Sequence, residues 1–110
     1  MIPIGCLLAL LGVAAGAFGA HGLKSTLTSS RLETFEIAVR YQMYHAIAIV
    51  LAGVLQAPAA GWCFVFGITI FSGSLYLLVL TDQRWLGAIT PFGGVLFLIG
   101  WVTLAATYKR

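Results

Sequence analysis

Residues 61–81 read "GWCFVFGITIFSGSLYLLVLT" and carry no charged side chain. A helix needs about 20 apolar residues to cross the roughly 30 Å hydrocarbon core of a bilayer, and this run has the required length. Three more apolar runs lie along the chain, at residues 2–23, 38–55 and 90–108. Each is long enough to cross the bilayer as a helix. The sequence therefore predicts four transmembrane helices.

The composition of the chain also indicates a lipid environment. Of its 110 residues, 61% are hydrophobic and 8% are charged, whereas about a quarter of the residues in ordinary soluble domains are charged. A soluble fold of this length lacks the interior to hide so much apolar surface. We therefore expect a single all-α transmembrane domain over residues 1–110. It belongs to a multi-pass integral membrane protein, located in the plasma membrane if the organism is bacterial.

The connections between the four runs favour an up-and-down four-helix bundle. Those at "QAPAAG", residues 56–61, and "TDQRWLGAI", residues 81–89, are short, and short connections make consecutive helices antiparallel neighbours. The first connection, "KSTLTSSRLETFEI" at residues 24–37, is the one strongly polar stretch. We expect it to form a short polar or interfacial segment between the first and second helices.

Two local patterns predict where helices begin. Ser30 followed three residues later by Glu33 is a capping-box pattern, so the second helix is expected to begin near Arg31, well before its apolar part. Thr90 and Pro91 fit the N-cap and the first position of the fourth helix, because proline lacks the backbone donor that this position leaves unused.

Six basic residues give the chain a net charge of +3. They stand singly or as a terminal pair, unlike the extended basic tract of a nucleic-acid-binding protein, so no nucleic-acid partner is expected. Four of them lie at one end of the helices, and two lie at the other end together with the terminal amine. When Arg40 is set aside as a structural residue the two ends are nearly tied, so the positive-inside rule sets no orientation. The six are Lys24, Arg31, Arg40, Arg84, Lys109 and Arg110.

Polar side chains enter the second apolar run. On a helix that turns about 100° per residue, Tyr41, Gln42 and His45 fall on a half of the surface that also carries small residues. Small and polar residues mark the side of a membrane helix that packs on other helices. The opposite side carries large aliphatic residues, which we expect to face lipid: Val39, Met43, Ile47, Val50 and Val54.

Two interpretations of His45 stay open. A histidine several turns inside a membrane protein is a candidate functional residue, because imidazole exchanges protons near neutral pH. The alternative is a structural histidine, hydrogen-bonded to a helix carbonyl or a hydroxyl, that helps two helices pack. His21, one turn before the end of the first helix, should lie on the same side of the membrane. A network through Tyr41 or Gln42 would join the two histidines.

The third helix adds Ser72 and Tyr76, which share one face and are expected to reach His45 across the bundle. No Gly-x-Ser-x-Gly elbow or triad carboxylate accompanies Ser72, so we expect no catalytic residue and no enzyme. The candidate polar site inside the membrane comprises His45, Tyr41, Gln42, His21, Ser72 and Tyr76.

Two histidines on neighbouring helices also raise the hypothesis of a bis-histidine haem site. A depth difference of about 7 Å between His21 and His45, from the 1.5 Å rise per residue, argues against both binding one iron. The hypothesis of a tetrahedral metal site has still less support, because no carboxylate or cysteine accompanies the two histidines within the membrane. We expect neither a metal nor a cofactor.

The remaining features concern the anchoring and packing of the helices. Glu36 and Arg40 stand four residues apart and are expected to form an interfacial ion pair at the level of the lipid headgroups. Glycines on one side of a helix let another helix backbone approach closely. The expected helix-packing glycines are Gly12, Gly16, Gly73, Gly93 and Gly100.

Four motifs occur in order along almost the whole chain: "GAFGAHGLK", "YQMYHAIAI", "FSGSLYLLVLT" and "LGAITPFGGVLFLIGW". Together they resemble the small four-helix family called domain of unknown function 423, which includes the eukaryotic transmembrane protein 256. The resemblance implies four membrane helices and adds no established activity. This chain begins "MIPIGC", where relatives often carry a basic residue. The family's motif positions fall on His21, Tyr41, Gln42, His45, Ser72, Gly73, Ser74, Tyr76, Thr90, Pro91, Gly93, Gly94 and Trp101.

The leading hypothesis for function is a non-enzymatic accessory, scaffold or lipid-binding module. Its expected partners are membrane lipids, with a homo-oligomer or a membrane-protein partner left open. The alternative is an oligomeric conductor of protons or small solutes that uses the region around His45. A haem-binding electron carrier comes third.

Overall fold

The computed structural model describes residues 1–108. Lys109 and Arg110, part of the expected charge balance, lie outside the described residues. Four helical stretches in the described part of the chain are long and apolar enough to cross a membrane, which confirms the all-α transmembrane fold class. The elements are α1 (Ile2–Ala14), the π-helical η1 (Ala15–Gly19), α2 (Ala20–Leu23), α3 (Ser29–Val54), α4 (Pro58–Thr81), the 3₁₀-helical η2 (Arg84–Ala88) and α5 (Thr90–Thr107).

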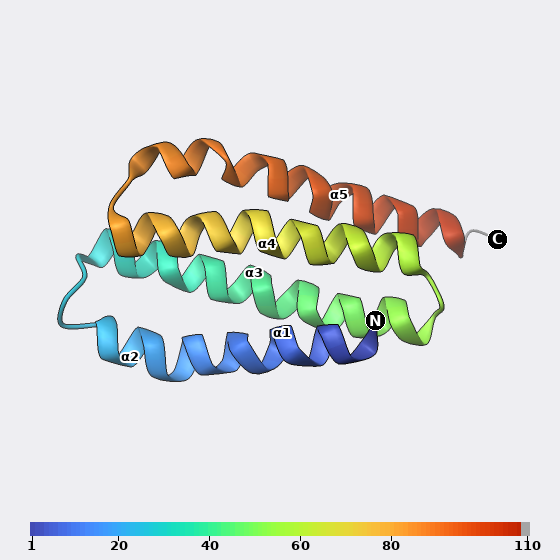
Figure 1. Ribbon diagram of the computed structural model, residues 1–110, viewed down its shortest axis with the longest axis horizontal. Helices are drawn as coiled ribbons and strands as arrows, with labels where there is room; N and C mark the ends of the chain where they lie inside the picture. The colour runs from blue at the N-terminus through green and yellow to red at the C-terminus, as the bar shows by residue number, and fades with distance from the viewer. Residues whose placement is uncertain (109–110) are drawn as a thin grey trace.

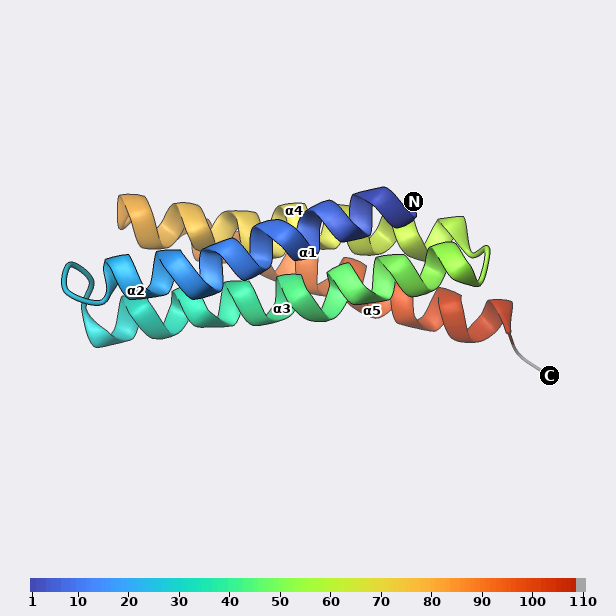
Figure 2. The ribbon, with the colours of Figure 1, turned by 90° about the horizontal axis from the view of Figure 1, so that it is seen from below.

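The order of the helices in the chain is also their order of packing. α1 packs on α3, α3 on α4 and α4 on α5, and Figure 1 shows the four side by side in this sequence. In the perpendicular view of Figure 2, α1 and α4 lie above α3 and α5 along most of their length. The bundle is therefore a zigzag of two layers.

The aliphatic stripe of α3 divides between a helix and the exterior, so the expectation that all of it faces lipid is wrong. A Cβ added to Gly12 of α1 would lie 2.5 Å from the sulfur of Met43, and one added to Gly16 would lie 3.1 Å from Val39 Cγ1. The glycine face of α1 thus receives these side chains, because close packing satisfies an aliphatic group as well as lipid does. The exposed members of the stripe are Ile47 and Val54.

The start of α3 differs from the predicted capping box. Thr28 is the N-cap, with an extended backbone, and its hydroxyl accepts a hydrogen bond from the Arg31 N–H at 3.2 Å. Ser30 is already helical, and its carbonyl accepts a bond from the Thr34 hydroxyl at 3.1 Å. Both hydroxyl residues suit a cap, and the extended backbone at Thr28 decides between them. α3 begins at Ser29, near the predicted Arg31.

The start of α5 also differs by one residue from the prediction. Ile89 occupies the N-cap, and Thr90 is the first helical residue. The 3₁₀ turn of η2 leads into α5 with helical backbone at Ile89, so Thr90 is not needed as a cap. Its hydroxyl lies 2.6 Å from that of Ser74 and joins α5 to α4 instead.

Arg31 ties the first turn of α3 to the last turn of α4, a contact that the sequence did not indicate. Its guanidinium donates a hydrogen bond to the carbonyl of Val79, and its Nε lies 4.0 Å from a carboxylate oxygen of Asp82. Asp82 ends α4 in the left-handed region, with a φ of 57°. A cation at the carboxyl end of a helix is favoured by the helix dipole and binds carbonyls that have no helical partner.

Candidate functional site

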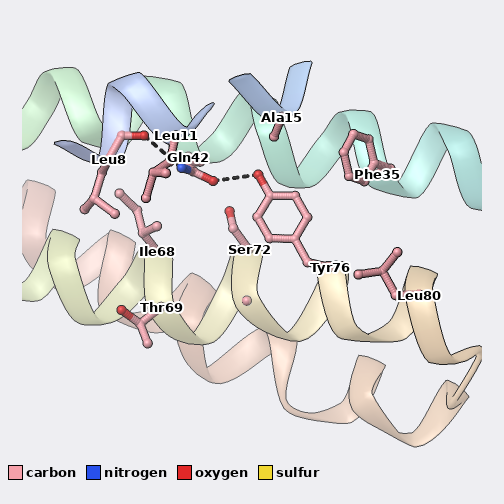
Figure 3. Close-up of a pocket in the computed structure, with 11 residues that line it drawn as sticks. Leu8, Leu11, Ala15, Phe35, Gln42, Ile68, Thr69, Ser72, Tyr76 and Leu80 are labelled. Carbon is pink, nitrogen blue, oxygen red and sulfur yellow. Dashed lines mark hydrogen bonds between the residues drawn. The ribbon is translucent and has the colours of Figure 1, made fainter. Parts of the chain in front are cut away.

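A groove runs between α1 and α4, with α3 as its floor (Figure 3). Its volume is about 480 Å³. It exists because α1 and α4 share a layer and both pack on α3. Most of its lining is apolar, from Leu8, Leu11, Ala15, Phe35, Ile68, Gly73 and Leu80, and its polar members are Gln42, Thr69, Ser72 and Tyr76.

The polar side chains that line the groove bind protein groups. Gln42 donates through Nε2 to the Leu8 carbonyl at 2.8 Å and accepts through Oε1 from the Tyr76 hydroxyl at 2.5 Å (Figure 3). Ser72 donates to the Ala38 carbonyl at 2.7 Å. These bonds connect α3 to α1 on one side and to α4 on the other. The polar groups that line the groove are therefore already hydrogen-bonded, which suits an apolar ligand.

Gly73 faces this groove, so its prediction as a packing glycine is wrong. A Cβ added there would meet no atom within 4 Å, whereas one added to Gly100 would lie 2.6 Å from a ring carbon of Phe64. Gly12, Gly16 and Gly93 likewise have close neighbours from another helix. The difference arises because α1 lies across the groove from Gly73 and not against it.

His45 lies in a second cluster, on the side of α3 that faces α5. Its Nε2 accepts a hydrogen bond from the indole N–H of Trp101 at 3.1 Å, and its Nδ1 lies 2.8 Å from the Tyr41 carbonyl. Because the indole can only donate, the ring proton of this arrangement is on Nδ1. The ring also stacks on Phe97, with centroids 3.6 Å apart and an interplanar angle of 8°. Both nitrogens and one ring face are therefore occupied.

A second groove of about 480 Å³ lies beside this cluster, between α3 and α5. Aromatic side chains form much of its lining, and Tyr41 packs there on Phe71 with ring centroids 4.8 Å apart. The zigzag therefore has one groove on each face.

The six predicted site residues do not form one network. Gln42, Ser72 and Tyr76 line the first groove, while Tyr41 and His45 line the second. The predicted contact of Ser72 with His45 is wrong, because Ser72 bonds the backbone of α3. Tyr41 and Gln42 are consecutive on α3, and a rotation of about 100° between them is enough to send them to opposite sides of α4.

His21 lies apart from both clusters. It is exposed on α2 and makes no side-chain hydrogen bond within the described residues, so the predicted network to His45 is not formed. Between residues 1 and 108, no group of three histidine, cysteine or acidic side chains is placed to hold a metal ion.

Trp101 is the site residue that sequence reasoning did not place beside His45. A signal for it existed, because an indole N–H deep in an apolar run needs an acceptor. Few side-chain acceptors occur in the apolar runs of this sequence, and a histidine is one of them.

Glu36 and Arg40 do not form the predicted ion pair. Within residues 1–108 the one ion pair joins Arg31 and Asp82, and the side chains of Glu36 and Arg40 are both exposed. An exposed pair gains little net free energy, since each long side chain loses rotamer freedom on pairing. The two instead border a third cavity, of about 330 Å³, on the seam between η1 and α3.

Comparison with known proteins gives a family and several relatives. Residues 15–94 match the family described as "Protein of unknown function (DUF423)". The chain is 49% identical to a UPF0382 membrane protein of Staphylococcus aureus, over 98% of this chain and 94% of that protein. It is 43% identical to the UPF0382 membrane protein YwdK of Bacillus subtilis, over 94% of this chain and 90% of that protein. No solved structure matches the chain.

Proposed function

The chain belongs to the DUF423 family of membrane proteins, as its four motifs predicted, and we propose that it binds an apolar lipid chain in the groove between α1 and α4. In this role the protein is a non-enzymatic lipid-binding module. The family itself has no established function, so the proposal rests on the groove.

The observation that carries the proposal is an apolar groove of ligand size whose polar side chains are already hydrogen-bonded. Pockets for small ligands measure roughly 300–1,000 Å³, and this one measures about 480 Å³. Leu11 and Leu80 line it and are 50% and 61% exposed, so the groove opens on a surface that faces lipid. Its lining contains no acidic, basic or histidine side chain, which supports binding over acid–base catalysis.

The arrangement around His45 gives less support to a proton conductor. A conducting histidine needs a second polar group or water to pass its proton on. Here both ring nitrogens bind protein groups, the Trp101 indole and the Tyr41 carbonyl. The contacts favour the interpretation of His45 as a residue that joins helices.

Filling the groove tests the proposal. In Gly73→Phe the new ring enters the groove without meeting protein near its Cβ, so the fold should survive. Gly22→Phe is the matched control, because Gly22 also has no atom within 4 Å of an added Cβ but does not line the groove.

The readout is photo-crosslinking to a phospholipid with a diazirine on its acyl chain, in liposomes, mapped by peptide mass spectrometry. The native protein and Gly22→Phe should label residues of α1 and α4 that line the groove, and Gly73→Phe should lose most of this labelling. The exposed face of α5, with Ile99 and Val102, lines neither groove, so it reports ordinary lipid contact and should label equally in all three. Unchanged groove labelling in Gly73→Phe would refute the proposal.

A further inference from the structure

The cavity on the seam between η1 and α3 has two opposite charges on its border. Glu36 and Arg40 stand one helical turn apart, and Gly16, Val39 and Met43 complete its lining. We propose that this cavity binds the headgroup of a zwitterionic phospholipid whose phosphate is linked to a primary ammonium. This cavity is separate from the groove between α1 and α4, since the cavity and the groove share no lining residue.

The position of the two charges along the chain matches the depth of a headgroup. Arg40 is the last charged residue before Asp82, so it marks the point where the polar start of α3 gives way to the apolar span. α3 has 26 residues and is therefore about 39 Å long, which exceeds the roughly 30 Å of hydrocarbon. Its first turns accordingly extend into the headgroup layer. Glu36 lies just before the apolar run 38–55, and Arg40 lies just inside it, where a long basic side chain reaches outward to the headgroups.

Both charges are available to a ligand. Glu36 and Arg40 are exposed, and in the described part of the chain neither is in an ion pair. A guanidinium binds a phosphate through parallel hydrogen bonds, and a carboxylate accepts hydrogen bonds from an ammonium. Side chains four residues apart on a helix have Cβ atoms about 5–6 Å apart, and the short ethanolamine link allows phosphate and ammonium to reach both.

The two opposite charges at the cavity favour one class of phospholipid headgroup over the others. An anionic headgroup would satisfy Arg40 but place like charge near Glu36. A trimethylated ammonium has no N–H to donate to Glu36. The half-buried Val39 and Met43, at the base of the cavity, provide apolar contact for the glycerol end of the acyl chains. Charge complementarity therefore favours a phosphatidylethanolamine headgroup.

The test is native mass spectrometry of the full chain in detergent, with phosphatidylethanolamine, phosphatidylglycerol and phosphatidylcholine of equal acyl chains. The native protein should prefer phosphatidylethanolamine by about threefold to tenfold, the effect of one exposed charge-assisted hydrogen bond. Glu36→Gln should remove this preference, whereas Arg40→Gln should weaken the binding of all three lipids. Glu33→Gln and Arg84→Gln are the matched controls, since both residues are exposed and neither lines the cavity.

Equal affinity for the three lipids, or a preference that survives Glu36→Gln, would overturn the inference. An equal loss of the lipid preference in the control variants would overturn the inference as well, because such a loss would show a general effect of charge. Glycerophosphoethanolamine, the headgroup without acyl chains, should bind at least tenfold more weakly, and equal binding would overturn the assignment to a lipid. Gly73→Phe should leave headgroup preference unchanged, so this inference and the groove proposal fail separately.

Discussion

Replacing Gly93 by alanine should loosen the contact between α5 and α4. The added Cβ would lie 2.8 Å from the Cα of Phe71, well inside the 3.5–4.0 Å at which carbon atoms make favourable contact. Backbone atoms cannot turn away as a side-chain end can, so the two helices must separate. Overpacking of this kind costs about 1–3 kcal/mol, while alanine in place of glycine gains at most about 1 kcal/mol of helix propensity. Because the clash is with backbone atoms, the cost should lie in the upper part of this range, about 2–3 kcal/mol, and we expect a net loss of about 1–2 kcal/mol.

Gly73→Ala is the matched control for this prediction. Its added methyl group meets nothing within 4 Å, so the gain in helix propensity should remain and raise stability by about 0.5–1 kcal/mol. The measurement is reversible unfolding in mixed micelles with increasing SDS, followed by circular dichroism. Two substitutions of the same type should thus shift the unfolding midpoint in opposite directions. A midpoint for Gly93→Ala at or above that of the native protein would refute the packing of α5 on α4 as described.

Three further predictions concern the polar contacts. Trp101→Phe removes the donor to His45 and should lower stability by about 0.6–1.5 kcal/mol in the same assay. Trp62→Phe should change stability little, because Trp62 is similarly exposed, 45% against 42%, but makes no side-chain hydrogen bond within residues 1–108; an equal effect of both would contradict the bond. Arg31→Gln should lower the free energy of unfolding by about 1 kcal/mol, because the carboxyl end of α4 loses its cation. Arg84→Gln serves as its control. Equal stability of the two variants would contradict the contact between Arg31 and the end of α4. Liposomes that contain the protein should show the same proton flux as empty liposomes under a pH gradient, with or without His45→Ala. A flux that depends on His45 would favour the conductor hypothesis.

The sequence predicted the parts of the fold that depend on single segments. Hydropathy reports whether a segment prefers lipid to water, so the four spans were recognisable from their composition. Family membership followed from four motifs in a fixed order, and the comparisons confirm it.

The sequence could not predict which helix each side chain meets. Val39 and Met43 are suited equally to lipid and to a glycine face, because both are apolar surroundings. Tyr41 and Gln42 share one half of a helical projection, but α4 lies between the directions in which they point. Their separation into two grooves depends on the zigzag order of the helices, and the order is a property of the whole assembly.

The cap of α3 and the two exposed charges show a second reason for the differences. Thr28 and Ser30 both supply a capping hydroxyl of similar rank, so the residue type does not choose between them. Glu36 and Arg40 have the spacing of an ion pair, but exposed pairing contributes too little to fix their rotamers. Where competing arrangements differ by so little, residue type alone does not decide.

Sequential packing also has a consequence for how the protein is made. Since α3 packs on α1, α4 on α3 and α5 on α4, each helix that enters the membrane finds its main neighbour already in place. α1 can bury Gly12 against Met43 as soon as α3 has entered, before the carboxyl end of the chain is made. Contacts between elements close in sequence form fast, since little loop entropy is lost. The chain is therefore suited to assemble one helix at a time during its synthesis.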